Sequence, residues 1–116
     1  MPERSKIKAF QKTRYVILFS TFSKRKDAEK VAEGLIAKRL AACCNLIPGL
    51  TSLFTWKGKK ERCSETLLMI KTTSHRLQSA CRFLQAHHPY EIPEIVAMPI
   101  IAGEVGYLKW IESSCR

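Results

Sequence analysis

Residues 87–94 bring together the side chains of this sequence that are best suited to chemistry. The segment begins with two histidines, His87 and His88, contains two prolines, and ends with Glu94. Each proline fixes its own φ and moves the residue before it out of the helical region, so the backbone here is stiff and extended. A polar loop between two apolar segments more often forms a site than a spacer. Imidazole and carboxylate groups suit metal binding or acid–base catalysis, and the segment alone leaves both open.

Structural roles compete with both chemistries. His88 stands where the preceding helix should end, and a histidine there can bond to free carbonyl groups and meet the negative end of the helix dipole. It also lies four residues after Leu84, at the end of an apolar stripe. Glu94 can form an ion pair with one of the many lysines of the chain. These alternatives stay open at the level of the sequence.

The apolar pattern around this segment predicts alternating strands and helices. Residues 15–19 form a continuous apolar run, which is typical of a central strand buried on both faces. Residues 28–36 repeat apolar side chains at helical spacing, with Ser23 placed to cap that helix. The remaining expected elements are a long hairpin over residues 42–72 with its turn at 57–60, a helix from Thr73 or Ser74 to His87, a strand at 95–98 and a short helix at 104–113.

This order of elements predicts an α+β fold. The sequence β-α-β-β-α-β with a short C-terminal helix and a long hairpin is the split β-α-β, or ferredoxin-like, arrangement, in which an antiparallel sheet carries helices on one face. A chain of 116 residues is long enough for one such domain. We expect residues 1–12 to be a flexible basic extension and residues 13–116 to be the folded domain.

The charge of the chain favours anionic partners, since the formal net charge is +10. The first 14 residues contribute five basic side chains and one acidic side chain. A basic arm can contact nucleic acid, but we do not expect this here, because basic and aromatic residues do not alternate as base-stacking surfaces require. A solvated tail is the simpler interpretation.

Cysteine usage and hydropathy indicate a cytoplasmic protein. The five cysteines are odd in number and form no C-x-x-C motif, which argues against a disulfide framework and a zinc knuckle. No apolar run approaches the roughly 20 residues that span a membrane, and the first residues lack the apolar core of a secretory signal. We therefore expect reduced thiols, no membrane association and a cytoplasmic location.

Three spaced sets of residues, taken together, resemble the CutA family of divalent-cation tolerance proteins. The first set comprises Leu40-Ala41-Ala42-Cys43, Asn45, Pro48-Gly49, Ser52 and Trp56-Lys57-Gly58-Lys59. The second is His88-Pro89-Tyr90-Glu91-Ile92-Pro93-Glu94, and the third is Tyr107-Leu108-Lys109-Trp110-Ile111. The likeness spans about residues 15–111, and the order of the three sets makes it specific.

The resemblance implies a ferredoxin-like subunit, a homotrimer in the cytoplasm, and a link to copper and other divalent metal ions. It implies metal contacts at His87 and His88, with Glu94 as a further candidate ligand. Ser20 stands where some members of the family have a cysteine ligand. A hydroxyl group is a far poorer copper ligand than a thiolate, so the expected binding is weak.

Neither enzyme chemistry nor phosphate binding is indicated. No local motif pairs a nucleophile with a base, and the chain has no Gly-rich phosphate loop. We therefore expect a non-enzymatic homotrimer that binds divalent metal ions weakly. The alternative is a PII-like trimeric signalling or scaffolding module, whose intersubunit clefts would bind a small anionic ligand or a partner protein.

Overall fold

The computed structural model describes residue 7 and residues 13–116, so the predicted extension at residues 1–12 lies outside the described residues apart from Ile7. The elements follow the predicted order. They are β1 (Tyr15–Phe22), α1 (Arg25–Ala37), β2 (Cys43–Trp56), β3 (Lys59–Thr73), a 3-10 turn (Ser74–Arg76), α2 (Leu77–His87), β4 (Val96–Pro99) and α3 (Val105–Ser114). None of the helices in this part of the chain is both long and apolar enough to cross a membrane.

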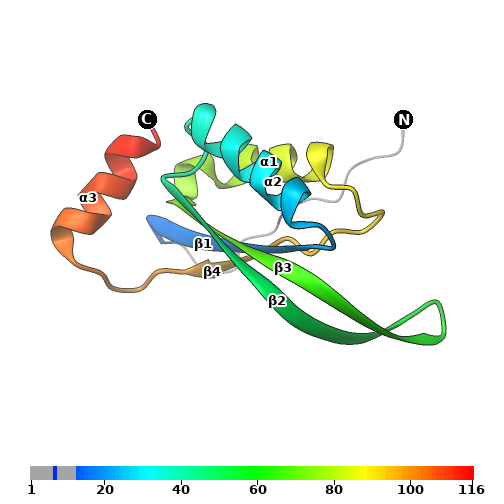
Figure 1. Cartoon of the computed structure of the whole chain (residues 1–116). Coiled ribbons are helices and arrows are strands. Elements are labelled where there is room, and N and C mark those ends of the chain that lie inside the picture. The colour runs from blue at the N-terminus through cyan, green and yellow to red at the C-terminus, as the bar shows by residue number, and fades with distance from the viewer. Residues whose placement is uncertain (1–6, 8–12) are drawn as a thin grey trace.

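The strands form one antiparallel sheet in the order β2-β3-β1-β4. Helices α1 and α2 lie together on one face of this sheet, and α3 lies beyond the end of β4 (Figure 1). The β2–β3 hairpin projects well past the rest of the sheet in the same view. The predicted α+β, ferredoxin-like arrangement is confirmed.

The central strand β1 is buried on one face only, which corrects the expectation of two buried faces. Val16, Leu18 and Phe22 are buried, whereas the alternate residues Ile17 and Phe19 are half-buried. Successive side chains of a strand point to opposite faces, and in a single copy of the chain the helices cover one face. The second apolar face of β1 is therefore not covered by the described helices of the same chain.

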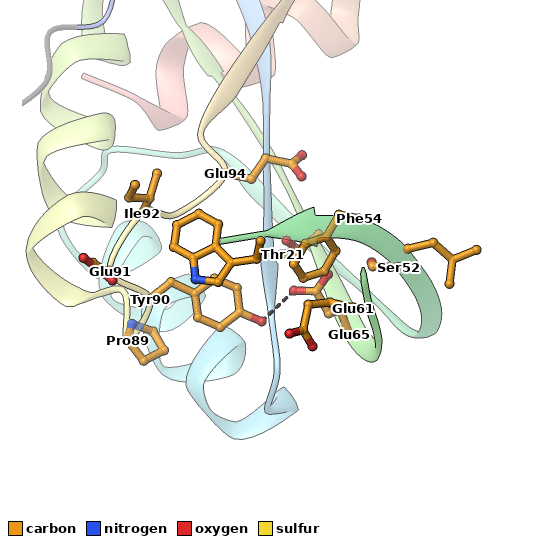
Figure 2. Close-up of a pocket in the computed structure, with 12 residues that line it drawn as sticks. Thr21, Ser52, Phe54, Glu61, Glu65, Pro89, Tyr90, Glu91, Ile92 and Glu94 are labelled. Atoms are coloured by element: carbon orange, nitrogen blue, oxygen red, sulfur yellow. Dashed lines mark hydrogen bonds between the residues drawn. The ribbon is translucent and has the colours of Figure 1, made fainter. Parts of the chain in front are cut away.

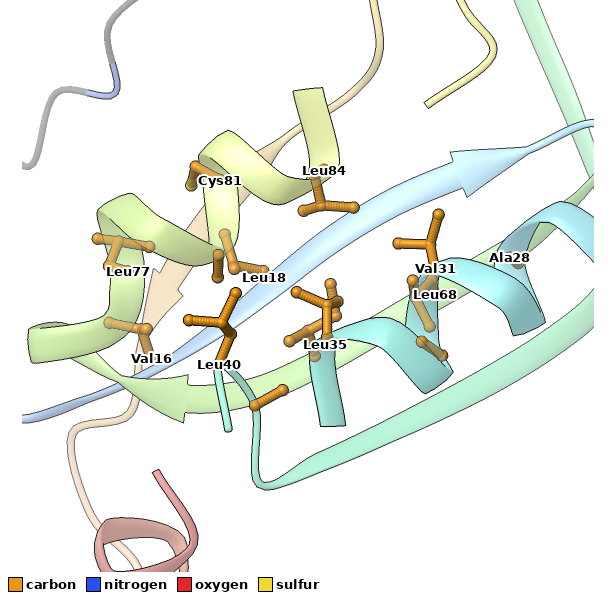
Figure 3. Packing of buried hydrophobic residues seen from close by; sticks show 14 of the residues in the cluster. Val16, Leu18, Ala28, Val31, Leu35, Leu40, Leu68, Leu77, Cys81 and Leu84 are labelled. Atoms are coloured by element: carbon orange, nitrogen blue, oxygen red, sulfur yellow. The ribbon is translucent and has the colours of Figure 1, made fainter. Parts of the chain in front are cut away.

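The core lies between the helices and the covered face of the sheet (Figure 3). Helices α1 and α2 each contribute a buried stripe at helical spacing, which faces Leu18 of β1 and Leu68 of β3. The buried residues of the two stripes are Ala28, Val31, Ala32 and Leu35 in α1 and Leu77, Ala80, Cys81 and Leu84 in α2. Burial of a large aliphatic side chain contributes about 1.5–3 kcal/mol, so these stripes fix the helices on the sheet.

Two irregularities shape the long hairpin, and the second of them is the turn that the sequence predicted. The pairing of β2 with β3 shifts register between Ile47 and Leu50, at the Pro48-Gly49 dipeptide, where Gly49 has a φ of 79°. The hairpin then closes at Lys57 and Gly58, whose φ values of 51° and 79° are those of a tight two-residue turn. A positive φ at glycine costs little, which explains the residue type at both places.

The predicted helix caps were wrong. Helix α1 begins after Lys24 rather than Ser23, and no side chain caps it. The second helix is preceded by the 3-10 turn, and the Thr73 side chain forms no capping bond there. Among the described helices, only α3 has a side-chain cap. There the Glu104 carboxylate accepts a hydrogen bond from the Tyr107 N–H at 2.9 Å.

Candidate functional site

The candidate segment joins the end of α2 to β4. His88 already has an extended backbone, with a φ of −79° and a ψ of 135°, because it precedes Pro89. Helix α2 therefore ends at His87, and the two histidines leave the helix in different directions. This difference in backbone decides what each imidazole can contact.

The His88 ring is buried and uses both of its nitrogens. Its Nε2 lies 2.9 Å from the carbonyl oxygen of Thr21, and its Nδ1 accepts the backbone N–H of Tyr90 at 3.1 Å. A carbonyl oxygen can only accept, so the ring carries its proton on Nε2. The ring also stacks on Phe22, with 4.1 Å between centroids.

The environment of His88 favours the neutral imidazole. Burial lowers its pKa below the ordinary value, against opposing contributions from the Thr21 hydrogen bond and from the charges of Glu65 and Asp27. A proton added at Nδ1 would also face the N–H group of Tyr90. In this arrangement His88 ties the loop to β1.

His87 is exposed at the last turn of α2. Its Nδ1 donates to the carbonyl oxygen of Phe83 at 2.9 Å, and its ring stacks on the Phe83 ring with 4.1 Å between centroids. The capping of a helix carbonyl that the sequence suggested for His88 is thus made by His87. The Nε2 atom has no hydrogen-bond partner among the described residues, and His87 lines a cavity of about 180 Å³ together with Asp27.

Glu94 lies in a different place from both histidines. It is exposed and lines a groove of about 770 Å³ between the hairpin and the loop, as Figure 2 shows. No ion pair with a described residue involves it. The structure therefore brings Glu94 to one groove and His87 to another cavity, with the buried His88 at neither.

The described residues do not assemble a tight metal centre. Within residues 13–116 and Ile7, no group of three or more His, Cys, Asp or Glu side chains is placed to hold one ion. Ser20 is fully buried on the helix-covered face of β1, and its Oγ has no hydrogen-bond partner among these residues. The donor set fits a weakly held cation at the surface rather than a resident metal.

The sequence did not single out Glu65, which is the most buried acid of the groove. Only 7% of this residue is exposed, and the Tyr90 hydroxyl donates to its carboxylate at 2.5 Å (Figure 2). Burial alone would raise its pKa, but hydrogen bonds from Ser52, Tyr90 and Thr21 outweigh burial and hold the pKa below its usual value. The feature of the sequence that could have identified it is an acidic residue next to the apolar half of β3, where the buried part of the strand begins.

A family model described as CutA1 divalent ion tolerance protein matches residues 16–114. Protein CutA of Homo sapiens is 45% identical over 93 residues, which is 80% of this chain and 52% of that protein. Protein CutA, chloroplastic, of Arabidopsis thaliana is 37% identical over 87% of this chain and 56% of its own length. The chain thus spans about half the length of these curated relatives. The divalent-cation tolerance protein CutA of Escherichia coli is 38% identical over 90% of this chain and 93% of its own length.

Solved structures agree with the sequence matches. CutA from Xylella fastidiosa superposes with a TM-score of 0.87 at 36% identity, covering 90% of this chain and 100% of that chain. The structure described as the periplasmic divalent cation tolerance protein CutA from Archaeoglobus fulgidus superposes with a TM-score of 0.85 at 33% identity, covering 88% and 99%. The likeness therefore extends over nearly all of the described fold.

Proposed function

Because this chain belongs to the CutA1 divalent ion tolerance family, we propose that it serves in divalent-cation tolerance as a homotrimer that binds such ions weakly. The main support for a metal contact is the exposed imidazole of His87. Its Nδ1 proton is used by the Phe83 carbonyl, which leaves a lone pair on an Nε2 atom at the protein surface. Neutral imidazole nitrogen is a common protein ligand of copper, nickel and zinc.

Weak rather than tight binding follows from the small number of donors. Asp27 lines the same cavity as His87, so two protein ligands are near one another there. His88 joins a metal site only if it gives up its bonds to Thr21 and Tyr90, and Glu94 lies in the neighbouring groove. We keep His87, His88 and Glu94 as the proposed contact set, with His87 as the first contact.

Association into a homotrimer is supported by surfaces that one copy leaves open. Strand β2 is 14 residues long and stands at an edge of the sheet, where unpaired backbone groups invite another strand. Near its end Phe54 and Trp56 are 44% and 39% exposed. Pairing with other copies would cover both the edge and these aromatic rings.

The proposal also covers the location of the protein in the cell and its lack of enzyme activity. The five cysteines are free in the structure, which suits a reducing cytoplasm, whereas the relatives' names include a chloroplastic and a periplasmic protein. We propose a cytoplasmic, non-enzymatic protein whose residues 13–116 act as one unit. The comparisons do not favour the PII-like alternative, and the groove between the hairpin and the loop is lined by carboxylates, which disfavour a small anion there.

Titration of Cu(II) into the full chain tests the metal contact. We expect His87→Ala to weaken Cu(II) binding by about tenfold, because the lost imidazole is one of few donors. His75→Ala removes another exposed histidine, outside the cavity, and is the matched control. Equal Cu(II) affinity in the wild type and His87→Ala would show that the histidine loop is not the site.

A further inference from the structure

A small cavity between the start of α1 and the end of α2 is lined by both a carboxylate and an imidazole. Asp27 stands in the first turn of α1 and His87 in the last turn of α2. The remaining lining residues are Lys30, Val31, Phe83 and Pro89. The two helices lie on the covered face of the sheet (Figure 1), so the cavity uses none of the surfaces proposed for the homotrimer.

The His87 ring is held in the way that metal-binding histidines usually are. Its Nδ1 donates to the Phe83 carbonyl oxygen at 2.9 Å, which leaves Nε2 as the nitrogen that can bind an ion. Stacking on the Phe83 ring, with 4.1 Å between centroids, fixes its orientation. Histidines that bind metals almost always donate their other ring N–H to a carbonyl, a carboxylate or water. Helix α2 therefore prepares this imidazole before an ion arrives.

The Asp27 carboxylate is not used by the rest of the described chain. Its side chain forms no hydrogen bond or ion pair within residues 13–116, whereas the nearby Glu29 is bound by Arg25 at 2.8 Å. Lys30, which lines the same cavity, forms no ion pair with it either. Both oxygens of Asp27 are therefore available to an ion.

The cavity has the size of a hydrated ion rather than of an organic ligand. Its volume of about 180 Å³ holds about six water molecules at roughly 30 Å³ each. Organic ligands occupy pockets of about 300–1,000 Å³. An ion with two protein ligands keeps several waters, so it fits the space between the two helices.

The chemistry of the two donors selects a class of ion. A nitrogen and a carboxylate oxygen together suit Cu(II), Ni(II) and Zn(II), whereas Mg²⁺ and Ca²⁺ take oxygen ligands. The positive charge of Lys30, an exposed residue of the same cavity, opposes a second cation there. The cavity thus contains both a second donor and a reason for low affinity.

We propose that Asp27 is the second protein ligand of the divalent ion that His87 contacts, so that the ion bridges α1 and α2, and that Lys30 weakens its binding. This inference rests on the proposed function, because it takes the His87 contact as given. It adds to the contact set a residue from outside the histidine loop.

Calorimetric titration of the full chain with Cu(II) tests the role of Asp27. We expect Asp27→Asn, which keeps the shape of the side chain, to weaken Cu(II) binding at least about fivefold. Glu33→Gln is the matched control, because it removes the same charge from an exposed position of α1 outside the cavity, and should change the affinity less than about twofold.

The expected effect of Lys30 has the opposite sign. Lys30→Gln removes a positive charge from the cavity and should strengthen Cu(II) binding about twofold. Lys26→Gln, an exposed lysine of α1 outside the cavity, is its control and should leave the affinity unchanged.

The double variant Asp27→Asn/His87→Ala separates ligation from a general effect of charge. Without His87 the remaining Cu(II) binding takes place elsewhere, so Asp27→Asn should then change it less than about twofold. The same loss with and without His87 would show that Asp27 acts by its charge alone, which would overturn the inference.

The inference and the proposed function fail in different ways. If His87→Ala weakens Cu(II) binding but Asp27→Asn binds as the wild type does, Asp27 is rejected and the proposed metal contact stands. If His87→Ala binds as the wild type does, the metal contact itself is rejected, and the inference with it. Should Asp27→Asn not fold, an unchanged affinity in Lys30→Gln would reject this cavity.

Discussion

Two neighbouring histidines have opposite surroundings because the backbone turns between them. His87 keeps a helical backbone and bonds to the Phe83 carbonyl one turn earlier, which leaves Nε2 at the surface. His88 is extended by the proline after it, and its ring enters the space between Phe22 and Tyr90. The sequence predicted metal contacts at both, because the contacts that bury His88 come from Thr21 and Phe22, far away in the chain.

His88 should make the protein sensitive to mild acid. Burial lowers its pKa in the folded state, so the unfolded chain takes up the proton first, near its ordinary value of about 6.5. Stability is therefore present above that pH and declines as the pH falls below it. The lowered pKa of Glu65 adds a loss only below about pH 4.3, outside this window.

The measurement is urea unfolding of the wild type and His88→Gln at pH 7.5, 6.5 and 5.5. At pH 7.5 we expect the variant to be less stable by about 1–3 kcal/mol, through the lost bonds to Thr21 and Tyr90. Its free energy of unfolding should then fall less than that of the wild type between pH 7.5 and 5.5. Parallel pH profiles would mean that His88 is not the titrating group.

At the scale of elements, the contact between α1 and α2 supports the candidate site. A Cβ atom at Gly34 of α1 would overlap the end of the Phe83 ring, and that ring stacks on His87. The absence of a side chain at this position therefore lets the two helices approach and sets the position of the exposed imidazole. Glycine here costs about 1 kcal/mol of helix propensity relative to alanine.

Gly34→Ala should destabilise the fold despite that gain in propensity. Overpacking of a formed contact costs about 1–3 kcal/mol, so we expect a net loss of about 1 kcal/mol in urea unfolding, together with a shift of the His87 ring signals in NMR spectra. The double variant Gly34→Ala/Phe83→Leu shortens the opposing side chain and should recover most of the loss. A single variant that is more stable than the wild type would show that Phe83 moves aside freely.

Periodicity predicted the elements well and their ends poorly. The apolar stripes of α1 and α2 and the hairpin with its turn follow from local patterns that the fold retains. The cap at Ser23 does not, because α1 begins one residue later than expected, after Lys24. The acidic groove was also missed, since it forms only when the hairpin and the loop meet, and this depends on contacts between segments distant in the sequence.

At the scale of the whole molecule, β4, the segment after it and α3 leave large apolar side chains exposed. Half or more of the surface of Val96, Met98 and Ile101 is exposed, at 50%, 55% and 85%, and Trp110 of α3 is 46% exposed. Large apolar side chains left exposed in this number are a feature of association surfaces. With the uncovered face of β1 and the edge of β2, this surface supports the proposed association of copies of this chain.

A charge at Ile101 should therefore prevent the proposed trimer from forming. Burying an unpaired carboxylate at an apolar contact is unfavourable, so we expect Ile101→Glu to sediment as a single 13.2 kDa chain while the wild type sediments at three times that mass. Ile36→Glu is the matched control, because Ile36 is an exposed isoleucine on α1, on the helix-covered side of the sheet, and should keep the wild-type mass. An Ile101→Glu protein of unchanged mass would place the contact elsewhere, and equal dissociation of both variants would indicate a general loss of folding rather than of an interface.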